Sequence, residues 1–142
     1  MPVALTSRVR SRRLQGPVLL AAGVLLAALL LRWRDPHVGG SWGLCPLRAL
    51  TGLDCPACGS LRAVNDLTHL RLDAAFHSNA AFVVAVPLLL AGWIWWLSCR
   101  WRGRPGPDLT GARARPAWWA AGALLVAFTV VRNTPWGHAY WA

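Results

Sequence analysis

The sequence contains three long blocks of apolar residues separated by polar segments. The blocks cover residues 17–31, 80–97 and 117–131, and none of them contains a charged residue. A helix needs about 20 apolar residues to cross the hydrocarbon core of a bilayer. The first block gains length from uncharged neighbours, since no charge occurs between residues 14 and 31. Only 14% of the residues are charged, against about 25% in average soluble proteins, which argues against an ordinary soluble globule.

We therefore expect an all-α integral membrane protein with three transmembrane helices and a short amphipathic helix in its outer loop. The expected spans are residues 14–31, 79–99 and 117–131. Pro87 is expected to kink the second span. The remaining segments are a basic N-terminus, an outer loop, an Arg-rich loop and an outer tail, at residues 1–13, 32–78, 100–116 and 132–142 respectively.

The distribution of arginine predicts the orientation of these spans. The chain has fifteen Arg, no Lys and five acidic residues, all of them Asp. Nine arginines lie in residues 1–13 and 100–116, whereas the outer loop and the tail hold six arginines and four of the aspartates. Basic flanks stay in the cytoplasm, so the N-terminus is expected there and residues 32–78 outside. The ten tryptophans gather at the predicted span ends, as aromatic belts do.

This orientation accounts for the net charge of +10 without a nucleic-acid partner, and the expected partner is the lipid bilayer. Abundant Arg, Ala and Trp in a chain without Lys suggest a bacterium with a GC-rich genome. The expected location is therefore a bacterial inner membrane, crossed several times.

The outer loop carries a predicted amphipathic helix over residues 56–70. Pro56 suits the first position of a helix, because its missing N–H costs nothing there. Leu61, Val64 and Leu67 then fall on one apolar stripe, with Ala57 and Leu70 at its ends. This helix is expected to lie on the outer membrane face or to pack onto the spans.

Three of the four cysteines lie in the same loop, at Cys45, Cys55 and Cys58. The fourth, Cys99, is expected alone at the inner end of the second span. A helix N-terminus stabilises a thiolate, so the predicted helix is expected to lower the pKa of the Cys55–Cys58 pair. Arg62, one turn beyond Cys58, is expected to add to this effect.

Three interpretations of these cysteines stay open. The leading one is a structural disulfide from Cys45 to Cys55 or Cys58, which would staple the loop in an oxidising compartment. The second is a zinc site in which His77 or His37 supplies a fourth ligand; His69 is excluded because a continuous helix places it about 16 Å from Cys58. The third is thiol–disulfide exchange by the Cys55–Cys58 pair, with Cys45 as the resolving thiol.

Other polar residues have expected structural roles. Arg62 and Asp66 are four residues apart and suit a surface ion pair. Asn79 is expected to position the chain as it enters the second span. Arg132 is expected to anchor the third span at the interface or to fold back onto the outer helix. No catalytic residues are predicted, because the chain contains no nucleophile–base pair, phosphate-binding loop or carboxylate pair.

The segment from Cys45 to Asn79 resembles a family of small bacterial membrane proteins, domain of unknown function 2752. The features that carry the resemblance are Cys45-Pro46, Thr51-Gly52, the CPxCG string from Cys55 to Gly59, Arg62-Ala63, Asn79 and Arg132-Asn133. The chain departs from the family pattern at Leu61, where Thr is usual, and at Ala80, where Pro is usual. The resemblance implies a small integral membrane protein and no particular activity.

The sequence thus predicts a structural or accessory membrane protein with a cysteine-stapled outer loop and no cofactor. Such a protein is expected to pack against a membrane protein partner or a second copy, since short spans favour association. The alternatives are a membrane thiol–disulfide oxidoreductase that uses Cys55 and Cys58, and a zinc-binding membrane protein.

Overall fold

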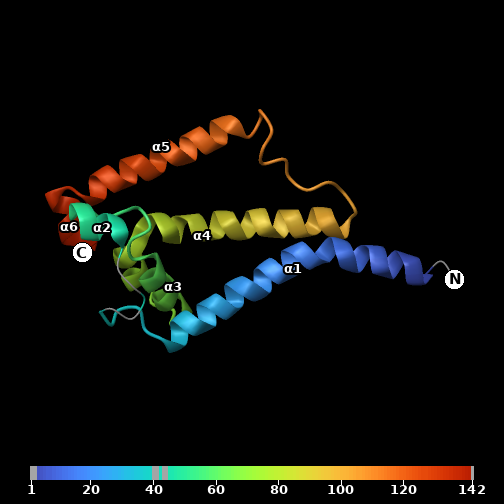
Figure 1. Ribbon diagram of the computed structural model, residues 1–142, viewed down its shortest axis with the longest axis horizontal. Helices are drawn as coiled ribbons and strands as arrows, with labels where there is room; N and C mark the ends of the chain where they lie inside the picture. Colours follow the sequence, from blue (N-terminus) through green and yellow to red (C-terminus); the bar gives the residue numbers. More distant parts are fainter. Residues whose placement is uncertain (1–2, 40–41, 43–44, 142) are drawn as a thin grey trace.

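The computed structural model describes residues 3–39, 42 and 45–141, with side chains from Arg12 onward. The regular secondary structure of this part of the chain is entirely helical, with no strand (Figure 1). The helices are α1 (Val3–Trp33), α2 (Pro46–Thr51), α3 (Ser60–Thr68), α4 (Leu72–Trp101), α5 (Arg115–Arg132) and α6 (Pro135–Trp141).

Two helices are long and apolar enough to cross a membrane. They are the Arg12–Trp33 part of α1 and the whole of α4, Leu72–Trp101. Only 11% and 6% of their most apolar windows are buried inside the protein. The core helix of a soluble protein has similar length and composition, but its apolar side chains are covered by other parts of the fold. The apolar surfaces of α1 and α4 are instead directed outward, as lipid-facing surfaces are.

The third predicted span is a helix, α5, which is not among the helices that meet this test. It has 18 residues, with Arg115 at its start and Arg132 at its end. Its packing within the described chain is mainly against α6. The structure therefore confirms the all-helical class with two membrane-length helices and leaves the third span as a prediction.

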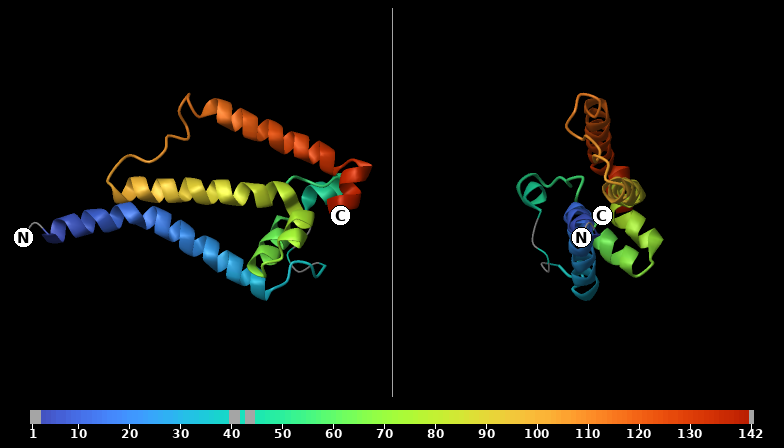
Figure 2. Two further views of the ribbon diagram at one scale, coloured as in Figure 1. Left: turned by 180° about the vertical axis from the view of Figure 1, so that it is seen from behind. Right: turned by 90° about the vertical axis from the view of Figure 1, so that its right-hand side faces the viewer.

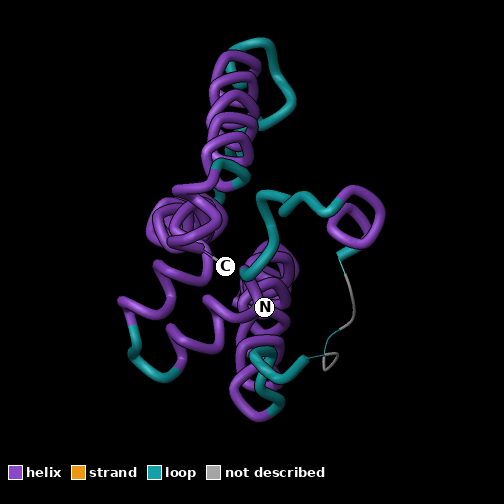
Figure 3. The backbone as a smooth tube through the Cα atoms, turned by 90° about the vertical axis from the view of Figure 1, so that its left-hand side faces the viewer, coloured by secondary structure: helices purple, strands orange, loops and turns teal. Residues whose placement is uncertain are grey.

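The long helices place the polar segments at two opposite ends of the molecule. α1 and α4 run in opposite directions, and α5 returns in the direction of α1 (Figure 1). The start of α1 and the 102–114 loop lie at one end, whereas α2, α3, α6 and the C-terminus lie at the other (Figures 1 and 2). α2 stands to one side of the remaining helices (Figures 2 and 3). The three cysteines of the predicted outer loop therefore lie at the opposite end from Cys99.

The backbone of α4 leaves helical φ and ψ at Asn79, whereas Pro87 keeps helical angles. Asn79 has φ −165° and ψ 94°, which is extended geometry inside an otherwise helical segment. Its side-chain Oδ1 accepts a hydrogen bond from the Phe82 N–H at 2.9 Å. This is the geometry of a helix N-cap, so Asn79 ends a short helix and starts the long apolar one.

The predicted helix over residues 56–70 is shorter than expected and buries a different face. It begins at Ser60 because Gly59, with φ +80°, adopts a left-handed conformation that ends the preceding turns. The buried residues of α3 are Ala63, Asn65 and Asp66, whereas Leu61 is 43% exposed. Of the predicted apolar stripe, Leu67 packs against the small core, whereas Leu61 and Leu70 are exposed.

Polar contacts explain why this face of α3 is buried. Asn65 donates to the carbonyl of Leu31 at 2.7 Å, at the end of α1. Asp66 accepts a hydrogen bond from Ser78 Oγ at 2.9 Å and pairs with Arg71 at 2.8 Å. A small apolar core of Ala63, Ala75 and Val83 joins α3 to α4 beside these contacts. α3 is thereby fixed at the end of the long helices that carries the cysteines.

Candidate functional site

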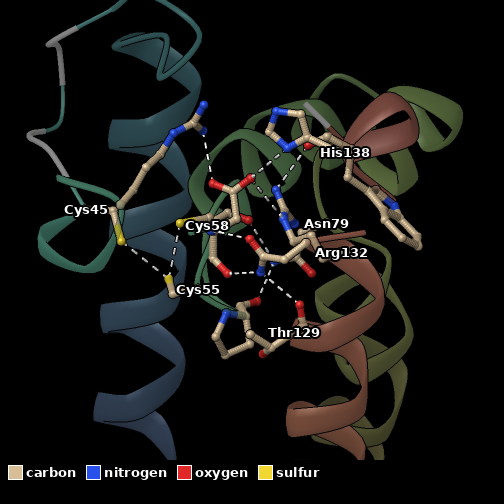
Figure 4. Close-up of polar contacts among 12 residues, drawn as sticks. Cys45, Cys55, Cys58, Asn79, Thr129, Arg132 and His138 are labelled. Atoms are coloured by element: carbon tan, nitrogen blue, oxygen red, sulfur yellow. Dashed lines mark hydrogen bonds and ion pairs between the residues drawn. The ribbon is translucent and has the colours of Figure 1, made fainter. Parts of the chain in front are cut away.

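Three cysteine side chains meet at this end of the molecule (Figure 4). The sulfur of Cys55 lies 3.2 Å from that of Cys58 and 3.6 Å from that of Cys45. All three sulfurs lie within 4.8 Å of one another. They are free thiols, since a disulfide bond requires about 2.05 Å. The structure thus brings the predicted cysteines together without supporting the predicted disulfide.

The three thiols line a cavity of about 610 Å³. Arg48 and Arg62 line it too, and so do His37 and Trp42 from the segment that follows α1. This segment therefore folds back toward the cysteines. The zinc hypothesis with His37 as the fourth ligand required such a fold. The cavity combines sulfur ligands with two guanidinium groups, a combination that the sequence spacing did not reveal.

Cys45 is held at the start of α2. It occupies the N-cap position, and Pro46 follows at the first helical position. The backbone N–H of Arg48, together with the Cys58 and Cys55 thiols, lowers the pKa of Cys45 from 9.0 to about 7. The expected effect of a helix N-terminus thus falls on Cys45, through a short helix that the sequence analysis did not predict.

The pKa of Cys58 shifts in the opposite direction to the one expected. Burial disfavours its thiolate, and hydrogen bonds with the thiols of Cys55 and Cys45 also favour the protonated form. The pKa of Cys58 is therefore raised from 9.0 to about 12. The prediction that a helix N-terminus activates this thiol was wrong, because α3 begins only after Gly59.

Asn79 holds the turn that carries Cys55 and Cys58. Its amide nitrogen lies 2.9 Å from the carbonyl oxygen of Pro56 and 3.0 Å from that of Cys58. A third acceptor, Ser60 Oγ, lies at 3.1 Å. The side chain is completely buried, and its Oδ1 caps the apolar part of α4 at the same time. Asn79 therefore ties the cysteine turn directly to the membrane-length helix.

Gly59 allows the same turn to approach α4 closely. A Cβ atom at this position would overlap the carbonyl oxygen of Ser78, well inside van der Waals contact. The positive φ of Gly59 would also strain any side chain. The glycine of the CPxCG string is thus required both by its backbone conformation and by the lack of space.

A buried polar network connects the cysteine segment to the end of α5. Asn133 accepts a hydrogen bond from the Asp54 N–H at 2.9 Å and donates to the Asp54 carbonyl at 2.8 Å. The Asp54 carboxylate is 2% exposed and pairs with Arg48 at 3.0 Å and with Arg132 at 3.8 Å. His138 Nδ1 lies 3.9 Å from the same carboxylate.

Arg132 is itself buried, with 2% of its surface exposed. It donates to the carbonyls of Trp141 at 3.1 Å and Ser78 at 3.5 Å. Arg132 thus folds back toward Asp54 and Ser78, and these contacts do not lie on the predicted outer helix over residues 56–70. Sequence reasoning missed Asp54, for which the signal was an acidic residue directly before Cys55 in a chain with few acids.

Two other predicted contacts are not formed. Asp66 pairs with Arg71 and not with Arg62, which lines the cavity instead. His77 stacks on Tyr140 at 4.4 Å, and its Nδ1 lies 2.8 Å from the Asp73 carbonyl oxygen of its own helix. Within the described segments, the residues close enough to share a metal ion are the three cysteines, without His77.

The fold and the site together define an all-α protein with two membrane-length helices and a three-thiol cluster held at one end of them. Residues 45–93 match the model of a family described as Protein of unknown function (DUF2752). This match confirms the predicted resemblance to that family over residues 45–93. Comparisons with curated proteins and with solved structures find no match.

Proposed function

We propose that this protein is a small multi-pass membrane protein that binds a thiophilic metal ion, zinc in the first place, through Cys45, Cys55 and Cys58. The observation that carries the proposal is the approach of the three sulfurs to within 4.8 Å of one another. Thiolates on a tetrahedral zinc ion with bonds of about 2.3 Å lie about 3.8 Å apart. The distances of 3.2 and 3.6 Å already approach this value, so small adjustments are sufficient to admit the ion.

The surroundings support metal binding by thiolates. Metal binding requires loss of the thiol protons. The lowered pKa of Cys45 supplies one thiolate near neutral pH. The pKa of Cys58 is raised by burial and by hydrogen bonds with the other two thiols, and a bound divalent cation would favour loss of its proton. The hydrogen bonds from Asn79 fix the turn that presents two of the ligands.

The proposed membrane placement follows from the two ends of the molecule. α1, α4 and, as a shorter third span, α5 cross the bilayer. The arginine-rich end, with the start of α1 and the 102–114 loop, faces the cytoplasm. The metal site then lies at the outer face. The surface of α5 is largely apolar and exposed, as expected of a lipid-facing helix, and this supports α5 as a span. Its exposed apolar side chains include Leu124, Val126 and Val130.

A membrane-impermeant alkylating reagent tests this placement in intact cells. Metal-stripped Cys45 is expected to react from outside, whereas Cys99 is expected to react only after permeabilisation. Single-cysteine variants that keep one of these two residues provide matched samples. Labelling of Cys99 before permeabilisation, with Cys45 protected, would reverse the proposed orientation.

Metal titration tests the site itself. The full chain in detergent is expected to bind one zinc ion, with release of protons, and to retain it during gel filtration. Cys58→Ser is expected to weaken zinc binding by at least tenfold, since it removes one of three ligands. Cys99→Ser is the control and is expected to bind as the native chain does. Equal binding by Cys58→Ser and the native chain would refute the proposal.

The same geometry revises the thiol–disulfide alternative. Cys45 has the lowered pKa and lies 3.6 Å from the Cys55 sulfur, so an exchange reaction would begin at Cys45. The two functions are distinguished by protein purified without reductant or chelator. Metal binding predicts three thiols that become reactive only after chelation, whereas exchange predicts a disulfide and one thiol.

A further inference from the structure

This inference rests on the proposed metal site and concerns its fourth coordination position. Structural zinc sites are closed by four protein ligands, whereas sites with three protein ligands keep a position for water or substrate. Three cysteine sulfurs form the ligand group within the part of the chain that the structure describes. The same sulfurs line the cavity of about 610 Å³, a size suited to a small molecule.

The two histidines considered as a fourth ligand, His37 and His77, are engaged with other groups. His37, which lines the cavity, has its Nδ1 2.8 Å from Asp35 Oδ1 and its Nε2 3.4 Å from Asp66 Oδ2. His77 is engaged with Tyr140 on another face. Trp42 directs its indole N–H to the Arg34 carbonyl at 2.9 Å. A metal ion held by the three cysteines would therefore keep its fourth coordination position for an external ligand.

The charge of the cavity favours an anion as that ligand. Arg48 is paired with Asp54 at 3.0 Å, and Arg132 lies 3.8 Å from the same carboxylate. Arg62 lines the cavity, and we find no hydrogen bond or ion pair for it with any described residue. Among the side chains that line the cavity, Arg48, Arg62 and a bound divalent ion together outweigh the three thiolates by one positive charge.

We infer that the cavity takes a small anionic metal ligand, with a thiolate, carboxylate or similar anionic donor on the metal and its charge held by Arg62. A guanidinium forms charge-assisted, often bidentate, hydrogen bonds with such groups. The size of the cavity leaves room for a ligand larger than a single ion. The site is therefore one that keeps a coordination position for an external anionic ligand, and not a closed structural site.

Cobalt substitution tests this inference in the full chain in detergent. Co²⁺ bound to thiolates gives a near-ultraviolet charge-transfer band, whose intensity reports the number of sulfur ligands. Its visible d–d band reports the fourth ligand. Thiocyanate is the anionic probe and imidazole the neutral one. In the native chain, thiocyanate is expected to shift the d–d band without loss of the charge-transfer band.

Substitution of Arg62 provides the decisive comparison. Arg62→Gln is expected to weaken thiocyanate binding about tenfold and to leave imidazole binding and the charge-transfer band unchanged. Arg62→Lys is expected to recover part of the loss, and Arg113→Gln, at the opposite end of the molecule, is expected to have no effect. The inference would be overturned if Arg62→Gln bound thiocyanate as tightly as the native chain does. It would also be overturned if thiocyanate did not shift the d–d band of the native chain. Absence of the charge-transfer band would instead refute the proposed metal site.

Discussion

Replacement of Asn79 by Ala removes two functions of one buried side chain. The Oδ1 atom caps the apolar part of α4 through the Phe82 N–H, and loss of such a cap costs about 1 kcal/mol. The amide nitrogen satisfies the carbonyls of Pro56 and Cys58, and each buried group left without a partner costs about 1–3 kcal/mol. We expect Asn79→Ala to lower the free energy of unfolding by at least about 3 kcal/mol.

Chemical denaturation in detergent, followed by circular dichroism, measures this change. Asn79→Asp separates the two functions, because a carboxylate keeps the cap acceptor but offers no donor to the two carbonyls. It is expected to retain the helix content and to lose metal affinity. Ser98→Ala is the control, since Ser98 Oγ donates to the Trp95 carbonyl at the far end of the same helix. A change below about 0.5 kcal/mol in Asn79→Ala, with native metal affinity, would refute the reasoning.

Three further substitutions or titrations test neighbouring parts of the structure. Gly59→Ala places a Cβ against the α4 backbone at a residue with positive φ, and it is expected to lower the free energy of unfolding by about 2 kcal/mol or more. A variant that unfolds at the same temperature as the native chain would contradict the close approach of this turn to α4. In the metal-free chain, alkylation of Cys45 is expected to reach half its limiting rate near pH 7, because its pKa is lowered to about 7 and the thiolate is the reactive form. Cys58, with its pKa raised to about 12, is expected to react slowly until far more alkaline pH, and similar pH profiles for both thiols, read by mass spectrometry, would exclude the described environments. Arg132→Met leaves a buried carboxylate with one cation fewer and is expected to cost about 3–5 kcal/mol in denaturation experiments, whereas a loss under about 1 kcal/mol would show that the network contributes little.

The long helices were predictable from composition alone, because continuous apolar sequence has few other stable forms in a membrane. The sequence also singled out Asn79 and Arg132, as polar residues at the ends of apolar blocks. It did not reveal that Asn79 interrupts α4, because an N-cap inside a helical run is recognised only when its partners, here the Phe82 N–H and the Pro56 carbonyl, are known.

The buried face of α3 was not predictable from its own pattern. Asn65 and Asp66 are buried because the end of α1 and the start of α4 supply their partners, and these partners are distant in sequence or on another element. The short helix α2 was missed, although Pro46 after Cys45 was a signal for a helix start. That omission led to the assignment of the activated thiol to the wrong end of the cysteine segment.

X-ray absorption at the zinc edge of the purified, zinc-loaded chain tests the central claim most directly. We expect about three sulfur atoms at about 2.3 Å and one lighter or exogenous ligand around each ion. Cys58→Ser is expected to reduce the sulfur number to about two, and Cys99→Ser is expected to leave it unchanged. A shell of nitrogen and oxygen alone, or a sulfur number that does not respond to Cys58→Ser, would contradict a metal site built from these three cysteines.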